Sequence, residues 1–262
     1  MPTDTGYFGP ESVTWRIHRE PLALVGGLRA LLLQALHPEA MALLYAKSDF
    51  QDDPWARLQR TAGYVATLTF APTADVDAAA AHVRGVHTRL GIADPAQLAW
   101  VHACQVDSFL VAARAAGIRL SRADTDAYVE EQVRAAAMVG VPDDLTPRTA
   151  DDLATYFGAV RPELRATKQA REAARYVLAP PMPVPGRYVL PARVGWSTIS
   201  SLAVGLLPGW ARRMYRLPPA PGAGLATAAG MRALRRAVRT LPVRYREGPM
   251  YRAAKARAEA LS

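Results

Sequence analysis

The feature that most constrains the fold is the spacing of apolar residues along an alanine- and leucine-rich chain. Apolar residues recur three and four positions apart over most of the sequence, and runs of β-branched residues are short. This spacing places apolar side chains on one face of an α-helix. We therefore expect an all-α protein that forms a single domain of roughly eight to eleven helices over residues 1–262.

Proline, glycine and capping residues indicate where these helices begin and end. The first strongly apolar helix covers 21–46 and is bent or broken at His37-Pro38, because proline disfavours helix at the residue before it. The clearest helix begins at Asp94, with Pro95 in its first turn, and ends at Gly117. The other helices predicted before residue 180 cover 53–70, 73–91, 121–140 and 149–176.

The C-terminal part has a different composition. Five prolines between 180 and 191 predict an extended crossing, and the apolar run 194–211 is interrupted by Pro208 and Gly209. We expect this run to form a buried helix, with docking at a membrane surface as the alternative, because it is too short and broken to span a bilayer. Residues 181–262 are thus predicted to form a basic, proline-rich and then helical extension that packs on the preceding core.

Charge is unevenly distributed between the two parts of the chain. The net charge is +9, but residues 161–262 carry 19 Lys and Arg against 4 Asp and Glu. Such a surplus fits an anionic membrane surface or simply solvated helix faces. Aromatic residues interleaved on strands, which single-strand binders use, are not visible, so we expect no nucleic-acid partner.

The N-terminus and the cysteine content predict a cytoplasmic protein. The opening "MPTDTGYFGP" carries an acid and prolines where an export signal has basic and apolar residues. The single cysteine, Cys104, excludes an internal disulfide framework and cysteine-cluster metal sites. Peripheral contact with a membrane remains an alternative to a purely cytoplasmic location.

Histidines are the main candidates for ligand chemistry. His82 and His87 are five apart, which on a helix is about 140° beyond a full turn, so they face different ways. His87 shares a mostly apolar face with Val83 and Leu90 and is predicted to point inward, whereas His82 is predicted to be exposed. His102 lies in an apolar helical stretch, where an imidazole needs a polar partner. Inward histidines are either satisfied core residues or ligands of a metal or haem iron in an apolar pocket.

Arg57 and Thr61 lie on one face of the helix predicted over 53–70, and Arg60 adjoins them. A guanidinium and a hydroxyl presented together can bind haem propionates or donate to an oxygen ligand, although a solvated arginine is the common alternative. Zinc-protease, glycine-rich phosphate-loop and serine-nucleophile motifs are absent from the sequence.

The chain resembles the oxygenase family named after the fungal enzyme MpaB, whose catalytic domain is related to the rubber oxygenase called latex clearing protein. The resemblance rests on "GGLRALLLQALHPEAMALLYAKSDF", "DPWARLQRTAGYVATLTF", "AAAHVRGVHTRLG" and "AWVHACQVDSFL", which occur in the expected order, and it fades near Pro183. It implies an all-helical catalytic core over 20–180 that encloses a haem pocket, with haem b held through one histidine.

The motifs also suggest individual residues. Because "VRGVH" is similar to the family's axial-histidine string, the resemblance implies that His87 is the axial iron ligand, with Arg84 in the same string. "RLQRT" places Arg57, Arg60 and Thr61 beside the distal side of the haem, and Arg60 stands where the family has lysine. In the region where the rubber enzymes use an acidic residue, this chain offers Glu39 or His37, and the resemblance assigns no role to the His102 of "WVH".

We therefore predict a haem b-dependent oxygenase that acts on a hydrophobic small molecule with O₂. The predicted catalytic residues are Arg57, Thr61 and His102, and His87, Arg84, Arg57, Arg60 and His37 are the predicted cofactor-binding residues. The alternatives are a haem-binding sensor or carrier without turnover, and a haem-free helical protein that docks on membranes through its basic C-terminal part.

Overall fold

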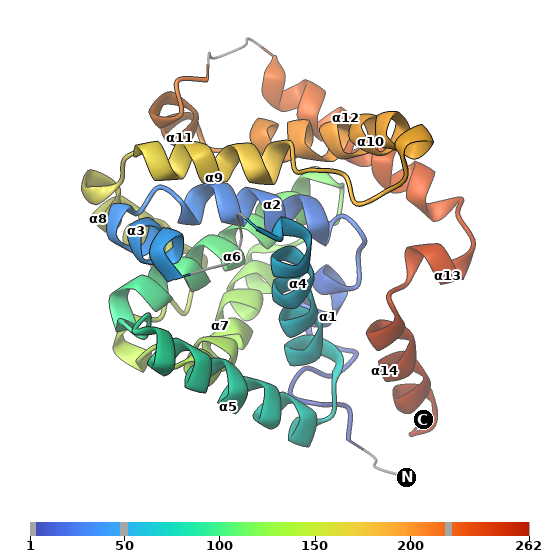
Figure 1. Ribbon diagram of the computed structural model, residues 1–262. Helices are drawn as coiled ribbons and strands as arrows, with labels where there is room; N and C mark the ends of the chain where they lie inside the picture. The colour runs from blue at the N-terminus through green and yellow to red at the C-terminus, as the bar shows by residue number, and fades with distance from the viewer. Residues whose placement is uncertain (1–3, 48–51, 218–221, 262) are drawn as a thin grey trace.

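The computed structural model describes residues 4–47, 52–217 and 222–261, and this part of the chain is all-α, as predicted (Figure 1). Fourteen α-helices occur in the described residues, without a β-strand. This number exceeds the predicted eight to eleven because three of the helices have only four to six residues. The longer helices are α2 (Ala23–Gln34), α3 (Pro38–Lys47), α4 (Pro54–Phe70), α5 (Thr73–Leu90), α6 (Pro95–Ala115), α7 (Arg122–Val139), α8 (Ala150–Val160), α9 (Lys168–Leu178), α10 (Gly186–Gly205), α12 (Ala223–Arg239) and α14 (Pro249–Glu259). The short ones are α1 (Val13–His18), α11 (Gly209–Met214) and α13 (Val243–Arg246).

Local capping chemistry sets most helix ends where the sequence predicts them. The Asp94 carboxylate accepts a hydrogen bond from the backbone N–H of Gln97 at 2.9 Å and so caps α6. Gly91 and Gly140 end α5 and α7 with φ of 66° and 94°, a left-handed conformation that glycine adopts without a Cβ clash. The predicted break at His37-Pro38 is confirmed, because α2 ends at Gln34 and α3 begins at Pro38.

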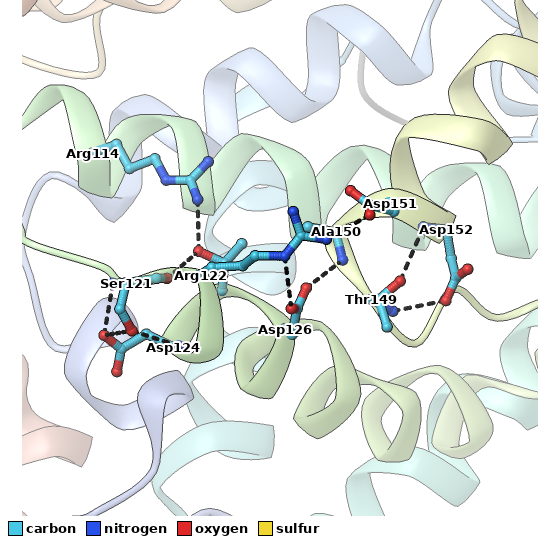
Figure 2. A network of polar contacts seen from close by, with 10 residues as sticks. Arg114, Ser121, Arg122, Asp124, Asp126, Thr149, Ala150, Asp151 and Asp152 are labelled. Atoms are coloured by element: carbon cyan, nitrogen blue, oxygen red, sulfur yellow. Dashed lines mark hydrogen bonds and ion pairs between the residues drawn. The ribbon is translucent and has the colours of Figure 1, made fainter.

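Capping boxes fix the N-terminal ends of α7 and α8 (Figure 2). In each box the first residue accepts from the backbone N–H three positions on, and the aspartate there accepts from the backbone N–H of the first residue. The pairs are Ser121 with Asp124 and Thr149 with Asp152. Asp126 of α7 also accepts from the backbone N–H of Ala150 at 2.9 Å, which joins the two helix starts.

The single helix predicted over 149–176 is wrong, because α8 and α9 are separate. α8 ends at Val160, and a short 3₁₀ turn over Arg161–Glu163 follows it. Pro162 lacks the N–H that would continue the α-helical pattern. A new helix then starts after Thr167, whose hydroxyl accepts from the backbone N–H of Ala170 at 3.1 Å.

The extended crossing predicted over 180–191 is also too long. Residues 180–185 are irregular, but α10 begins at Gly186 and contains Pro191. Proline at this position removes only the bond to the Arg187 carbonyl, and Arg187 is exposed, so water can satisfy that carbonyl.

The core is built around the close pair α2 and α6, to which α10 is joined by a buried arginine. Arg29 is 3% exposed, and its guanidinium pairs with Asp107 at 2.8 Å. It also donates to the Ser108 hydroxyl at 2.6 Å and to the Leu206 carbonyl at 2.8 Å. Arg29 of α2 therefore binds acceptors in α6 and at the C-terminal end of α10.

The C-terminal helices pack on the helices that precede them. α10 contacts α2, α12 contacts α6, and α14 contacts α4 (Figure 1). Within the segments that the structure describes, no helix combines the length and the apolar character needed to cross a bilayer.

Candidate functional site

A cavity of about 260 Å³ lies among α2, α3, α4, α5, α6, α9 and α10, and it is partly open to solvent. Its volume lies just below the ~300–1,000 Å³ range of small-molecule sites. The wall is mostly apolar, and the amide side chains of Gln34, Gln97 and Gln105 are among its few polar groups. Its apolar wall includes Leu28, Leu31, Met41, Leu44, Leu98 and Val101.

Three of the residues singled out in the sequence line this cavity together. Arg57 and Thr61 come from α4, and His87 comes from α5, which packs beside α4. The Thr61 hydroxyl donates to the Arg57 carbonyl at 3.0 Å, a local bond that holds it one turn away from Arg57. A guanidinium, a hydroxyl and an imidazole thus line one side of a mostly apolar cavity.

The His87 imidazole is half-buried and incompletely satisfied. Its Nδ1 is inaccessible to solvent and has no hydrogen-bond partner among the residues that the structure describes. Burial lowers the pKa of His87, and the nearby charge of Arg57 lowers it further. The ring is therefore neutral at pH 7, the state in which histidine binds metal ions.

Three other predicted cofactor-binding residues, Arg84, Arg60 and His37, do not line the cavity. Arg84 donates to the Met138 carbonyl at 2.7 Å, at the end of α7. Arg60 is exposed on α4. His37 is buried, and its Nδ1 accepts from the backbone N–H of Ala40 at 3.3 Å. The structure thus brings His87, Arg57 and Thr61 together, without Arg84, Arg60 or His37.

His102 faces the packed interior. Burial lowers its pKa to about 4, and a hydrogen bond with the backbone of Gln132 on α7 partly opposes this shift. His102 does not line the cavity. Its catalytic role stays a prediction that this site does not support. His82 is exposed on α5, as the helical spacing predicts.

Sequence reasoning missed the aromatic part of the cavity wall. Trp55 of α4 and Trp196 of α10 both line the cavity, and their rings meet edge to face with centroids 4.7 Å apart. The Trp196 indole N–H donates to the Val177 carbonyl at 3.0 Å, which orients the ring. Helical spacing can indicate that each tryptophan faces inward, but it cannot pair residues so far apart in the chain.

His18, to which the sequence assigns no role, is a satisfied core histidine. Its Nδ1 lies 2.8 Å from the Thr69 hydroxyl, and its Nε2 lies 2.9 Å from the Tyr128 hydroxyl. Burial lowers its pKa to about 3. Both ring nitrogens are therefore occupied, in contrast to the unpartnered Nδ1 of His87.

Comparison with known proteins yields one match. The family described as "ER-bound oxygenase mpaB/B'/Rubber oxygenase, catalytic domain" matches residues 15–240. The matched range begins in α1, ends just after α12 and includes the cavity residues Arg57, Thr61 and His87. Searches of curated proteins and of solved structures found no match.

Proposed function

Because the chain belongs to the mpaB/rubber oxygenase catalytic-domain family, we propose that it is a haem b-dependent oxygenase that acts on a hydrophobic small molecule with O₂. The observation that carries the haem part of this proposal is the environment of His87. Its neutral imidazole borders an apolar cavity, and a buried ring nitrogen lacks a partner in the described part of the chain.

The residues present fit a haem in their donor chemistry. A porphyrin supplies most ligands of its iron itself, so a single axial imidazole is sufficient from the protein. An unpartnered buried nitrogen destabilises the free protein, and bonding to a metal ion or to an incoming polar group removes that penalty. His87 would hold the iron, and haem bound there would supply the redox chemistry that activates O₂.

Arg57 and Thr61 would hold the polar edge of the cofactor or of the substrate. Arg57 lies close enough to His87 for its charge to lower the pKa of that imidazole. A guanidinium at the rim of an apolar cavity favours a carboxylate, such as a haem propionate. Thr61 presents a hydroxyl one helical turn along, where it can turn from the Arg57 carbonyl to a ligand.

The wall chemistry favours an apolar substrate. Apolar side chains form most of the surface, so burial of a hydrocarbon there gains about 25 cal/mol per Å². The three glutamine amides offer hydrogen bonds that would orient a polar group of the same molecule.

Reaction of the haem-loaded protein with O₂ tests this function. We expect the reduced, loaded protein to react with O₂ and to consume it faster when hydrophobic substrates are added, and Arg57→Met to slow that consumption. A stable six-coordinate spectrum with two histidine ligands and no reaction with O₂ would instead indicate a carrier or sensor. Failure of the wild-type protein to take up hemin would contradict haem dependence altogether.

A further inference from the structure

A long acid-free segment leaves the C-terminal helices with a surplus of arginine. From Ala173 to Arg246 the sequence contains twelve arginines and no Asp or Glu. Helices α12 and α13 lie within this segment (Figure 1). Any acid that neutralises their arginines must therefore come from another part of the chain or from a ligand.

A polar cleft of about 210 Å³ forms where the end of α1 meets α12, α13 and α14. Most of its lining residues are charged, namely Arg19, Glu20, Arg235, Arg239, Arg246 and Glu247. Four arginines against two glutamates leave the lining with two uncompensated positive charges. The cleft shares no residue with the cavity that contains His87.

Glu20 pairs mainly with one arginine of the cleft. Its two carboxylate oxygens accept from Nε and Nη2 of Arg235 at 2.9 and 2.6 Å, a bidentate pair in which both side chains are mostly buried. Arg239 reaches the same carboxylate only at 3.6 Å. Glu20 therefore neutralises Arg235 and leaves most of the remaining positive charge uncompensated.

Arg246 is incompletely satisfied in the cleft. Its Nη1 donates weakly to the Arg239 carbonyl at 3.3 Å. Its Nε is buried and finds no acceptor among the described residues. A buried guanidinium N–H without an acceptor is destabilising, and an anion in the cleft would supply the acceptor.

We propose that this cleft binds a phosphate group. A phosphate monoester carries about −1.5 to −2 charges at pH 7, which matches the two uncompensated charges of the lining. Its oxygens also suit the planar guanidinium fork, which binds phosphate in bidentate fashion. The bound phosphate would bridge α1 to α12 and α13, and it comes either from a small soluble phosphate or from an anionic lipid headgroup.

Binding by the whole 262-residue chain tests the proposal, with Arg246→Met as the variant and Arg244→Met as the matched control. Arg244 lies in the same short helix, stacks over the Tyr245 ring at 4.8 Å and does not line the cleft. The two probes are inorganic phosphate at constant ionic strength, followed by calorimetry, and vesicles of phosphatidylcholine with or without phosphatidic acid, followed by co-sedimentation. Melting temperatures in chloride buffer establish that both variants fold, and Arg239→Met serves as a second cleft variant.

We expect Arg246→Met to weaken binding about tenfold or more and Arg244→Met to leave it nearly unchanged. Binding of inorganic phosphate with this pattern supports a soluble ligand, whereas the same pattern with phosphatidic acid vesicles alone supports a lipid headgroup. The proposal is overturned if neither probe binds, if Arg246→Met and Arg239→Met bind like the wild type, or if Arg244→Met weakens binding equally.

Discussion

Substitution of Gly26 by alanine tests the close approach of α2 and α6. A Cβ at this position would lie 2.8 Å from Cδ1 of Phe109, 3.1 Å from the Ser108 carbonyl oxygen and 3.2 Å from the Cβ of Ala112. All three contacts are shorter than ordinary van der Waals contacts, and the neighbours lie in a buried helix. The next residue, Gly27, has no atom within 4 Å of the corresponding position and provides the matched control.

The expected effect follows from two opposing contributions. Alanine in a helix interior is more favourable than glycine by roughly 0.5–1 kcal/mol, and this gain applies to both positions. Overpacking of a core typically costs about 1–3 kcal/mol, and it applies only at Gly26. Gly27→Ala should therefore stabilise the protein slightly, and Gly26→Ala should be about 1–3 kcal/mol less stable than Gly27→Ala.

Urea unfolding followed by circular dichroism measures both variants. The midpoint should fall for Gly26→Ala at an unchanged m-value and should rise slightly for Gly27→Ala. Equal midpoints for the two variants would show that α2 and α6 are not in the close contact described above.

Two further predictions concern buried ionisable side chains. His18 and His102 have pKa values lowered to about 3 and 4 in the folded protein from an ordinary value of 6.5, so the unfolded chain takes up protons first. Stability should fall as pH drops below about 6.5, by up to about 1.4 kcal/mol per pH unit for each histidine, and His18→Gln should flatten the decline in a pH series of thermal melts. Asp107→Ala leaves the Arg29 charge buried and should destabilise by roughly 3–5 kcal/mol, whereas Arg29→Met should cost less because the Asp107 side chain is 29% exposed. Chemical unfolding gives both values, and equal losses would argue against this asymmetry.

Helix ends were predictable because their chemistry is local. Asp94, Ser121 and Gly140 each act on backbone groups within a few residues, so a short window of sequence contains the whole interaction. The break at Pro162 is equally local, because proline lacks the N–H that would continue the helix, but the predicted helix over 149–176 ran through it. At Pro191 the prediction was wrong in the other direction: an extended segment was predicted, but the residue lies in α10, because proline near an exposed helix start is tolerated.

The site was predictable only in part because its residues come from distant segments. Helical spacing predicted that Arg57 and Thr61 share a helix face and that His87 points inward. The family resemblance predicted that all three lie in one site. Neither the spacing nor the resemblance could show that His102 faces α7 or that Trp196 lines the cavity, since both depend on how whole helices pack. The buried pair of Arg29 and Asp107 was missed for the same reason.

Hemin titration of the purified protein, followed by the Soret absorbance and the bound iron, tests the assignment of His87 most directly. The wild type and His82→Ala should bind hemin in a one-to-one ratio, because His82 is exposed on the same helix and away from the cavity. His87→Ala should lose the axial-imidazole spectrum, and free imidazole should restore it. An unchanged spectrum in His87→Ala, or its loss in His82→Ala, would contradict the assignment.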